Sequence, residues 1–276
     1  MTGRGGGYED EVSARVKNHV RESGDPGAAP LLFAHGFGCD STMWRYVAPR
    51  FEDRFRVILF DYVGHGGAAR SPYDPARYES LHGYAQDVLD ISEELDLRGV
   101  TFVGHSVSAM IGALAAIAQP HRFARLVMIG PSPRYIDEQG YRGGFSREDI
   151  DGLLESLESN YLGWSSAMAP VIMGNGDRPA LSDELANSFC RTDPEIARRF
   201  ATATFLSDNR SDLEDVPVPT LVMQCADDVI APREVGEYVN GRIPESRIVY
   251  LQATGHCPNL SAPSETVAAL ERFLEH

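Results

Sequence analysis

The chain has 276 residues, of which 43% are hydrophobic and 24% are charged, a composition that is typical of ordered globular proteins and excludes a disordered chain. The balance of 25 lysines and arginines against 40 aspartates and glutamates gives a formal charge of −15, which argues against nucleic acids and anionic lipid surfaces as partners. The length suits one large domain that carries an insertion.

The N-terminus is polar and acidic, without the apolar core of a secretory signal, and we expect residues 1–10 to form a flexible tail. No apolar stretch approaches the length of a membrane span. The four cysteines are scattered and form no CxxC pair, so neither a zinc site nor a disulfide framework is predicted. We therefore expect a cytoplasmic protein with reduced thiols at Cys39, Cys190, Cys225 and Cys257.

Short apolar runs bounded by glycine, proline and polar residues predict buried strands. They lie at Pro30–Ala34, Arg56–Phe60, Thr101–Val103, Leu126–Ile129, Thr220–Gln224 and Arg247–Leu251. Segments of helical length separate several of them, such as Tyr84–Leu95 and Val107–Ala118. Strands that alternate with helices of this length predict an α/β fold, with a mainly parallel sheet and helices on both of its faces.

The alternation stops after Gly130. From there to about Asp215 the chain has amphipathic helical patterns and no convincing strand, and the helical patterns lie at Ile150–Tyr161, Asp183–Phe189 and Pro194–Phe205. A helical insertion in a parallel sheet predicts a cap over the carboxyl edge, where ligands bind in such folds. We predict a core of residues 1–130 and 216–276 and a helical cap of residues 131–215.

The strongest local motif is Gly104-His105-Ser106-Val107-Ser108, between the strand Thr101–Val103 and the helix Val107–Ala118. It resembles G-x-S-x-G, in which a strained strand-to-helix turn exposes a nucleophilic serine. The turn requires small flanking residues, which Gly104 satisfies and Ser108 satisfies in part. Taken alone, the pentapeptide also fits an ordinary serine N-cap.

The order of later residues favours the catalytic interpretation of Ser106. An acid and then a histidine follow the serine along the chain, each after a predicted strand, as the triad of this fold requires. His256 is the candidate base. Asp227 and Asp228 are both candidate acids, and Asp228 is favoured because the acid loop usually has a proline four residues later, as Pro232 is here.

A glycine-flanked loop, Ala34-His35-Gly36-Phe37-Gly38, follows the first strongly predicted strand. Acyl transfer needs two N–H donors for the oxyanion, one after the nucleophile and one from this earlier loop. We assign these donors to Val107 and Phe37. The alternative is that His35-Gly36 only forms a tight turn.

Other residues are interpreted as structural. Gly64-His65-Gly66-Gly67 lacks the spacing of a nucleotide-binding loop, and the remaining histidines lack metal-ligand spacing. We therefore predict no cofactor and no metal. Cys39 and Cys257 flank the predicted site but lack the partners of a cysteine nucleophile. Trp164 and Phe205 are expected to pack in the cap, with some such residues lining the roof of the pocket.

With these motifs placed, the chain resembles the RsbQ-type α/β hydrolases of bacterial stress signalling and, more distantly, the plant karrikin- and strigolactone-receptor hydrolases. The resemblance runs from about Leu31 to Leu274 and includes His35–Asp40, Val57–Gly64, Gly83–Asp90, Phe102–Val107, Gly130–Pro133, Gln224–Asp228 and Gly255–Pro258. It implies a four-helix cap over a closed, mainly apolar cavity, a triad of Ser106, Asp228 and His256, and an oxyanion hole at Phe37 and Val107. It also implies a PAS-domain phosphatase as partner, and Ser108 departs from its glycine.

The sequence thus predicts a serine hydrolase that cleaves a small, largely apolar ester or lactone through an acyl-enzyme. The alternative is a receptor-like signalling protein that turns over slowly or once and binds a partner protein through its cap. Cofactor-free haloperoxidases and C–C bond hydrolases also keep serine, histidine and aspartate. Ser106 argues against dehalogenase and epoxide hydrolase chemistry, which needs aspartate at that position.

Overall fold

The computed structural model describes residues 12–71 and 73–275, so the tail expected at residues 1–10 lies outside the described residues. The described strands form one sheet in the order β1-β3-β2-β4-β5-β6-β7, parallel except for β1, which runs antiparallel to β3. The strands are β1 (Arg21–Ser23), β2 (Pro30–Ala34), β3 (Arg56–Leu59), β4 (Val100–His105), β5 (Phe123–Ile129), β6 (Thr220–Asp227) and β7 (Ser246–Thr254). The predicted parallel sheet is confirmed.

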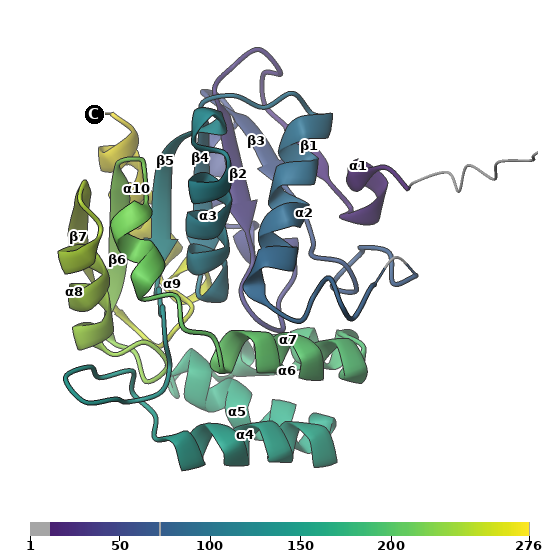
Figure 1. Ribbon diagram of the computed structural model, residues 1–276, viewed down its shortest axis with the longest axis vertical. Coiled ribbons are helices and arrows are strands. Elements are labelled where there is room, and N and C mark those ends of the chain that lie inside the picture. Colours follow the sequence, from purple (N-terminus) through teal and green to yellow (C-terminus); the bar gives the residue numbers. More distant parts are fainter. Residues whose placement is uncertain (1–11, 72, 276) are drawn as a thin grey trace, which may run out of the picture.

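The sheet separates two apolar cores, as the alternation along β2 demonstrates. Leu31 and Phe33 pack into one core, whereas Leu32 and Ala34 pack into the other, and all four are fully buried. Successive side chains of a strand point to opposite faces, so a strand that is apolar throughout needs cover on both. The flanking helices supply it (Figure 1) and are α2 (Leu81–Glu94), α3 (Val107–Ala118), α8 (Arg233–Arg242) and α10 (Pro263–Leu274).

Shorter helices complete the flanks of the sheet. Two α-helical turns, α1 and α9, and four 3₁₀ turns connect the longer elements within the described residues. They are α1 (Ala14–Lys17), η1 (Ser41–Trp44), η2 (Ala48–Phe51), η3 (Pro120–Arg122), η4 (Ser211–Asp215) and α9 (Pro258–Ser261).

Between β5 and β6 the chain forms four consecutive helices, which we call the helical layer: α4 (Arg147–Ser159), α5 (Tyr161–Met173), α6 (Pro179–Arg191) and α7 (Pro194–Phe205). Figure 1 shows them stacked beyond one end of the sheet, with α6 and α7 nearer the strands and α4 farther away. The amphipathic pattern at Pro194–Phe205 predicts α7 correctly. The helical layer covers the end of the sheet at which the parallel strands finish.

Two details differ from the sequence predictions. The single helix expected at Ile150–Tyr161 is wrong at its C-terminal end, because α4 ends at Ser159 and a separate helix, α5, begins at Tyr161. The side chain of Asn160 accepts a hydrogen bond from the N–H of Gly163 and caps α5, which explains the break. The sequence patterns do not predict β1, a short edge strand of three polar residues.

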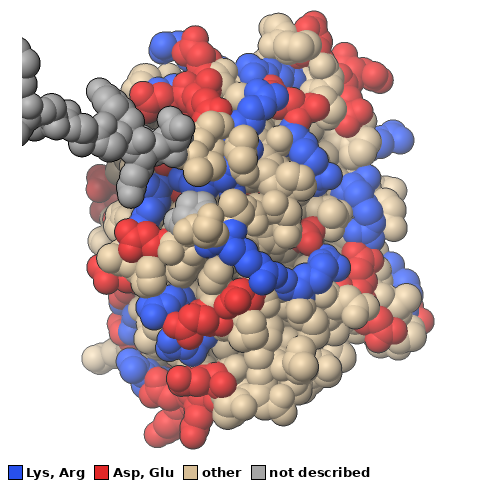
Figure 2. Space-filling model, turned by 90° about the vertical axis from the view of Figure 1, so that its right-hand side faces the viewer, with Lys and Arg blue, Asp and Glu red and all other residues tan. Residues whose placement is uncertain are grey.

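Charged side chains of both signs share the surface. Figure 2 shows lysines and arginines interspersed with aspartates and glutamates on the face that carries α1. Many are paired, as in the contact of 2.6 Å between Arg56 Nη2 and Glu22 Oε2. Within residues 12–71 and 73–275, no helix combines the length and the apolar character that crossing a membrane requires.

Candidate active site

Three polar side chains from three different strand ends lie in one hydrogen-bonded chain. Ser106 follows β4, Asp228 follows β6, and His256 lies two residues beyond β7. Ser106 Oγ is 2.7 Å from His256 Nε2, and His256 Nδ1 is 2.7 Å from Asp228 Oδ2. All three are buried. The structure therefore brings together the residues that the sequence predicts as nucleophile, base and acid.

The backbone at Ser106 is strained in the way the motif predicts. Its φ is +57° and its ψ is −125°, a conformation that side chains other than glycine rarely adopt. The turn is tight, because a Cβ atom on Gly104 would lie 2.4 Å from the carbonyl oxygen of Ser108. The N–H of Ser106 donates to the carbonyl of Ile129 on β5. This geometry places the hydroxyl above the end of the sheet.

Ser108, which stands where the motif usually has glycine, is fully buried and hydrogen-bonded. Its hydroxyl donates to the carbonyl of His35, with 2.5 Å between the oxygens, and it lies 2.8 Å from the hydroxyl of Tyr62. Because the proton of Ser108 is directed to His35, Tyr62 acts as the donor to Ser108. This side chain therefore ties the turn after β4 to the loop after β2.

The two candidate acids have different surroundings. Asp228 Oδ1 accepts hydrogen bonds from the N–H groups of Ile230 and Ala231, at 2.9 and 3.0 Å, while its Oδ2 faces His256. Asp227 is exposed, and its main-chain carbonyl accepts from the N–H of Gly255. Asp228 is the aspartate in contact with the histidine. An acceptor at Nδ1 keeps the proton there and leaves Nε2 free to accept the proton of Ser106.

Small residues and the helical layer hold the His256 loop in place. A Cβ atom on Gly130, whose φ is +58°, would lie 3.1 Å from His256 Cε1 and 3.4 Å from Asp228 Oδ2. The N–H of His256 donates to the carbonyl of Ile172 near the end of α5, at 2.8 Å. The position of the imidazole thus depends on a contact with the helical layer.

A hydrogen bond from the His105 side chain holds the main chain at His256. His105 Nε2 lies 2.7 Å from the main-chain carbonyl of His256 and donates to it, while His105 Nδ1 is buried without a hydrogen-bond partner. Burial, and next to it the charge that His256 carries when protonated, lowers the pKa of His105 to about 3. His105 is therefore neutral at physiological pH and holds the loop without adding a charge.

The two predicted oxyanion donors come from adjacent strand ends. β2 and β4 are hydrogen-bonded neighbours with Ala34 opposite Gly104, so the loop at Phe37 lies beside the turn at Ser106. A Cβ atom on Gly36 would lie 3.3 Å from Ser106 Cβ. Val107 is the first residue of α3, and a helix leaves the N–H groups of its first turn without acceptors inside the helix. The backbone at both predicted donors therefore lies close to the serine.

A cavity of about 30 Å³ lies between the serine and the helical layer. This volume holds a water molecule or two but no substrate. Most of its walls are apolar and aromatic, and they include Phe37, Ile172, Leu185, Phe189, Phe205 and Ile230. Among them, Phe37 lies with its ring centroid 5.8 Å from that of Phe205 and 5.9 Å from that of Trp164. The helical layer therefore closes over an apolar site.

The two cysteines that flank the serine in the predicted site also line this cavity. Burial raises the pKa of Cys39 to about 12 and that of Cys257 well above its ordinary value. Both are therefore protonated thiols at neutral pH, and a thiol is a far weaker nucleophile than a thiolate. Ser106, which has a base in contact, is the better candidate for the nucleophile.

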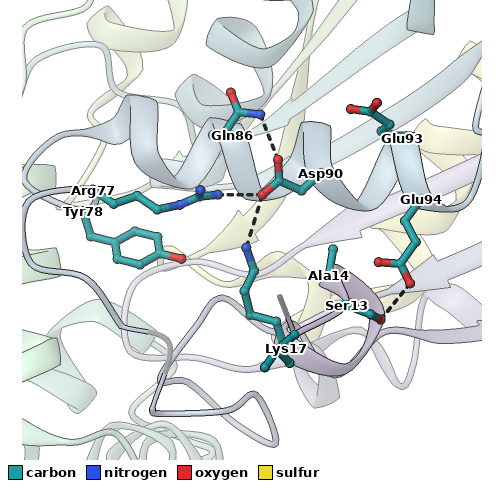
Figure 3. A pocket seen from close by; sticks show the side chains of 10 residues that line it. Ser13, Ala14, Lys17, Arg77, Tyr78, Gln86, Asp90, Glu93 and Glu94 are labelled. Atoms are coloured by element: carbon teal, nitrogen blue, oxygen red, sulfur yellow. Dashed lines mark hydrogen bonds and ion pairs between the residues drawn. The ribbon is translucent and has the colours of Figure 1, made fainter. Parts of the chain in front are cut away.

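A larger hollow of about 680 Å³ lies away from the serine, between α1 and α2 (Figure 3). Three of its charged side chains are paired with one another: Asp90 Oδ2 is 3.2 Å from Lys17 Nζ and 2.7 Å from Arg77 Nη2. Ser13 donates its hydroxyl to Glu94 and has no imidazole beside it in Figure 3. The hollow is therefore an ion-paired part of the surface, and none of the side chains drawn in Figure 3 is an activated nucleophile.

Phe205 lines the cavity and Trp164 packs against Phe37 from the helical layer, in agreement with the expectation that residues of this kind pack in the cap and line the roof of the pocket. One cavity residue escapes the sequence predictions, and it is Thr204. The signal for Thr204 is its position: Ile196, Phe200 and Thr204 are spaced four residues apart on one buried stripe of α7, where a hydroxyl is unexpected. Among the described residues, no group of His, Cys, Asp and Glu side chains is arranged to hold a metal ion.

The chain is similar to known proteins over most of its length. The family described as "Alpha/beta hydrolase family" matches residues 31–270. A karrikin insensitive 2 receptor of Petunia hybrida is 38% identical over 251 residues, which cover 91% of this chain and 93% of the receptor. The strigolactone esterase of Arabidopsis thaliana is 38% identical over 245 residues, or 88% of this chain and 91% of the esterase.

A solved structure is similar in both sequence and fold. It is a hydrolase from Oleispira antarctica, with 41% identity and a TM-score of 0.93, and the match covers 95% of this chain and 96% of that one. The similarity therefore extends over the sheet and the helical layer together.

Proposed function

The chain belongs to the alpha/beta hydrolase family, and from this premise we propose that it is a serine hydrolase that cleaves a small, largely apolar ester or lactone through an acyl-enzyme. The observation that carries the proposal is the hydrogen-bonded chain of Ser106 Oγ, the His256 ring and Asp228 Oδ2, with 2.7 Å at each contact. Nucleophile, base and orienting acid in such contact are what serine catalysis requires.

In the acylation step, Ser106 Oγ attacks the carbonyl carbon of the substrate while His256 Nε2 takes the hydroxyl proton. Asp228 stabilises the imidazolium that forms and stays ionised. The negative charge of the tetrahedral intermediate develops on the former carbonyl oxygen, to which the N–H groups of Phe37 and Val107 donate. Collapse of the intermediate transfers the proton from His256 to the leaving alcohol, or to the ring oxygen of an opened lactone.

In the deacylation step, His256 accepts a proton from water, and the resulting hydroxide attacks the acyl group on Ser106. The second tetrahedral intermediate uses the same two N–H donors. When it collapses, Ser106 leaves and recovers its proton from His256, and the carboxylic acid is released. The cycle needs no cofactor.

The apolar walls of the cavity support the substrate class. Residues 131–215, which include the helical layer, are proposed to act as a cap that excludes water and selects the substrate, with residues 1–130 and 216–276 as the core. The cavity of about 30 Å³ is too small for a substrate, so the cap must move for entry.

The test is hydrolysis of a short-chain p-nitrophenyl ester by the wild type, Ser106→Ala and His256→Ala. Loss of the nucleophile or the base should lower kcat by about 10³-fold or more. Equal thermal unfolding of the three proteins is the control. A Ser106→Ala protein as active as the wild type would contradict the proposal.

A receptor-like function is the second candidate, and two observations favour it. The cavity of about 30 Å³ is too small to admit a substrate without movement of the helical layer, and one of the similar proteins is named a karrikin insensitive 2 receptor. In this alternative the triad turns over slowly or once, and movement of the cap recruits a partner protein. A stoichiometric burst of p-nitrophenol that stalls would support it, whereas sustained turnover would support the hydrolase.

The RsbQ-type resemblance leads us to propose cytoplasmic stress signalling with a PAS-domain phosphatase as the partner. The −15 charge is consistent with a protein that binds no nucleic acid. Size-exclusion chromatography of the protein with such a phosphatase, with and without a bound ester, would test the partner directly. Two separate peaks in both conditions would contradict it.

A further inference from the structure

Thr204 places a free hydroxyl in the wall of the apolar cavity. The residue lies near the end of α7, is 1% exposed, and lines the same cavity as Ser106 and His256. Its Oγ1 is buried and has no hydrogen-bond partner among the described residues. A buried hydroxyl that lacks a partner is costly and rare in native proteins, so its presence beside the serine requires an explanation.

Hydrogen bonding within α7 does not account for this hydroxyl. A threonine in a helix commonly donates its hydroxyl to the carbonyl four residues earlier. Two threonines of this chain do so: Thr202 donates to Arg198, at 2.9 Å, and Thr266 donates to Ala262, at 3.1 Å. Thr204 makes no such bond to Phe200. Its hydroxyl is therefore not used by α7.

From this geometry we infer that Thr204 is a specificity-determining residue whose hydroxyl donates a hydrogen bond to a second oxygen acceptor of the substrate, separate from the carbonyl that Ser106 attacks. The inference rests on the proposed hydrolase function and narrows its substrate. The preferred class is an apolar ester or lactone that carries an ether, ketone or second ester oxygen on the side that faces the cap.

The chemistry of the surrounding wall supports an acceptor on the ligand. Phe205, Leu185 and Phe189 offer no hydrogen bond, so a ligand oxygen beside them would lose its hydration without compensation from these side chains, and the hydroxyl of Thr204 can supply that compensation. A substrate that has only alkyl groups on this side would leave the hydroxyl of Thr204 without a hydrogen-bond partner. Sites with a buried hydrogen-bonding group discriminate against such analogues.

The experiment compares pairs of isosteric p-nitrophenyl esters in which an ether oxygen replaces one methylene: butanoate with methoxyacetate, pentanoate with 3-methoxypropanoate, and hexanoate with 4-methoxybutanoate. The ratio of kcat/KM between the wild type and Thr204→Val is measured for each ester, which cancels differences in intrinsic reactivity. Thr204→Val should lower kcat/KM about tenfold for at least one ether ester and less than about twofold for its alkyl partner.

Three controls separate a binding role from a structural one. Thr204→Ser should restore the preference for the ether ester, and the exposed Thr202→Val should leave it unchanged. Thr204→Val should unfold at the same temperature as the wild type or higher, because valine has the same shape and no unpaired hydroxyl.

Equal losses for ether and alkyl esters, or no loss in any pair, would overturn the inference while leaving the proposed hydrolase intact. If none of the esters shows hydrolysis that Ser106→Ala abolishes, the proposed function itself fails, and the inference fails with it.

Discussion

Ser108 illustrates how one substitution in a motif is accommodated at the scale of single residues. Glycine at this position would leave the hydroxyl of Tyr62 and the carbonyl of His35 to find other partners. Serine instead connects the two, with hydrogen bonds of 2.8 and 2.5 Å. The carbonyl of His35 lies two residues before Phe37, a proposed oxyanion donor, so Ser108 acts as a positioning residue for that loop.

Ser108→Ala should therefore leave two buried polar groups unpaired and lower the free energy of unfolding by about 1–3 kcal/mol. Because the loop that carries the proposed oxyanion donor Phe37 also loses this hydrogen bond, kcat should fall while KM changes little. Urea unfolding and steady-state ester hydrolysis measure the two effects. Tyr62→Phe, which keeps the bond from Ser108 to His35, is the matched control, and a larger kcat loss in that variant would contradict the assignment.

Individual site residues differ in how far the sequence predicts them. Ser106 and His256 are predictable because the chain order and the strand ends restrict where a triad can lie. The preference for Asp228 over Asp227 needs a loop pattern, and the contact with His256 then agrees with it. The free hydroxyl of Thr204 is not predictable, because a sequence does not tell whether a helical threonine bonds to its own helix.

At the scale of elements, α6 is the helix that joins the helical layer to the loop after β2. Ser188 donates its hydroxyl to the carbonyl of Gly38, at 3.0 Å, and Arg191 Nη2 pairs with Asp40 Oδ2, at 2.7 Å. Gly38 has a φ of +68°, and a Cβ atom there would lie 2.0 Å from Phe189 Cδ1. The close approach of α6 to this loop therefore depends on a glycine.

Gly38→Ala should displace α6 and disturb the adjacent Phe37, a proposed oxyanion donor, because alanine at positive φ costs about 1–2 kcal/mol and its methyl group collides with Phe189. We expect a lower unfolding temperature and a clear loss of kcat/KM. The control is Gly152→Ala on the exposed face of α4, where a Cβ atom meets nothing within 4 Å. That change should raise helix stability by up to about 1 kcal/mol without affecting activity.

If Gly38→Ala and Gly152→Ala proved equally active and equally stable, α6 would not control the loop in the way described. Differential scanning fluorimetry and ester hydrolysis on the same protein samples make the comparison.

Individual elements also differ in how well local sequence patterns predict them. Strands β2 and β4 are predictable because burial on both faces makes them apolar throughout. Strand β1 is not, since Arg21, Glu22 and Ser23 form a short antiparallel edge whose pairing with β3 comes from tertiary contacts. Helix α5 escapes prediction because Pro170 lies inside it and its apolar residues surround the axis without a clear stripe.

At the scale of the whole molecule, buried neutral histidines couple folding to pH. Burial lowers the pKa of His65 and of His105 to about 3, compared with about 6.5 in an unfolded chain. Between these values the unfolded chain binds more protons than the folded protein, so stability is highest above about pH 6.5 and is lost as the pH falls towards 3. Each of these histidines contributes a slope that approaches about 1.4 kcal/mol per pH unit.

His65→Asn should reduce this slope by the contribution of one histidine, since asparagine does not titrate and can keep the contact of His65 Nδ1 with the carbonyl of Val63. Urea unfolding between about pH 6 and 5 measures the slope, because the carboxylates of the unfolded chain titrate mostly nearer pH 4. His121→Asn, at an exposed position, controls for the loss of one histidine. An unchanged slope in His65→Asn would contradict the linkage.

Ser106 is proposed to form a covalent acyl intermediate, and the mass of the intact protein after rapid acid quenching of its reaction with a p-nitrophenyl ester tests this directly. We expect an added mass of one acyl group per chain, located by peptide mapping on the segment that contains Ser106 and absent in Ser106→Ala. An acyl group found instead on Cys39 or Cys257, or persistent labelling of Ser106→Ala to the same extent, would contradict it.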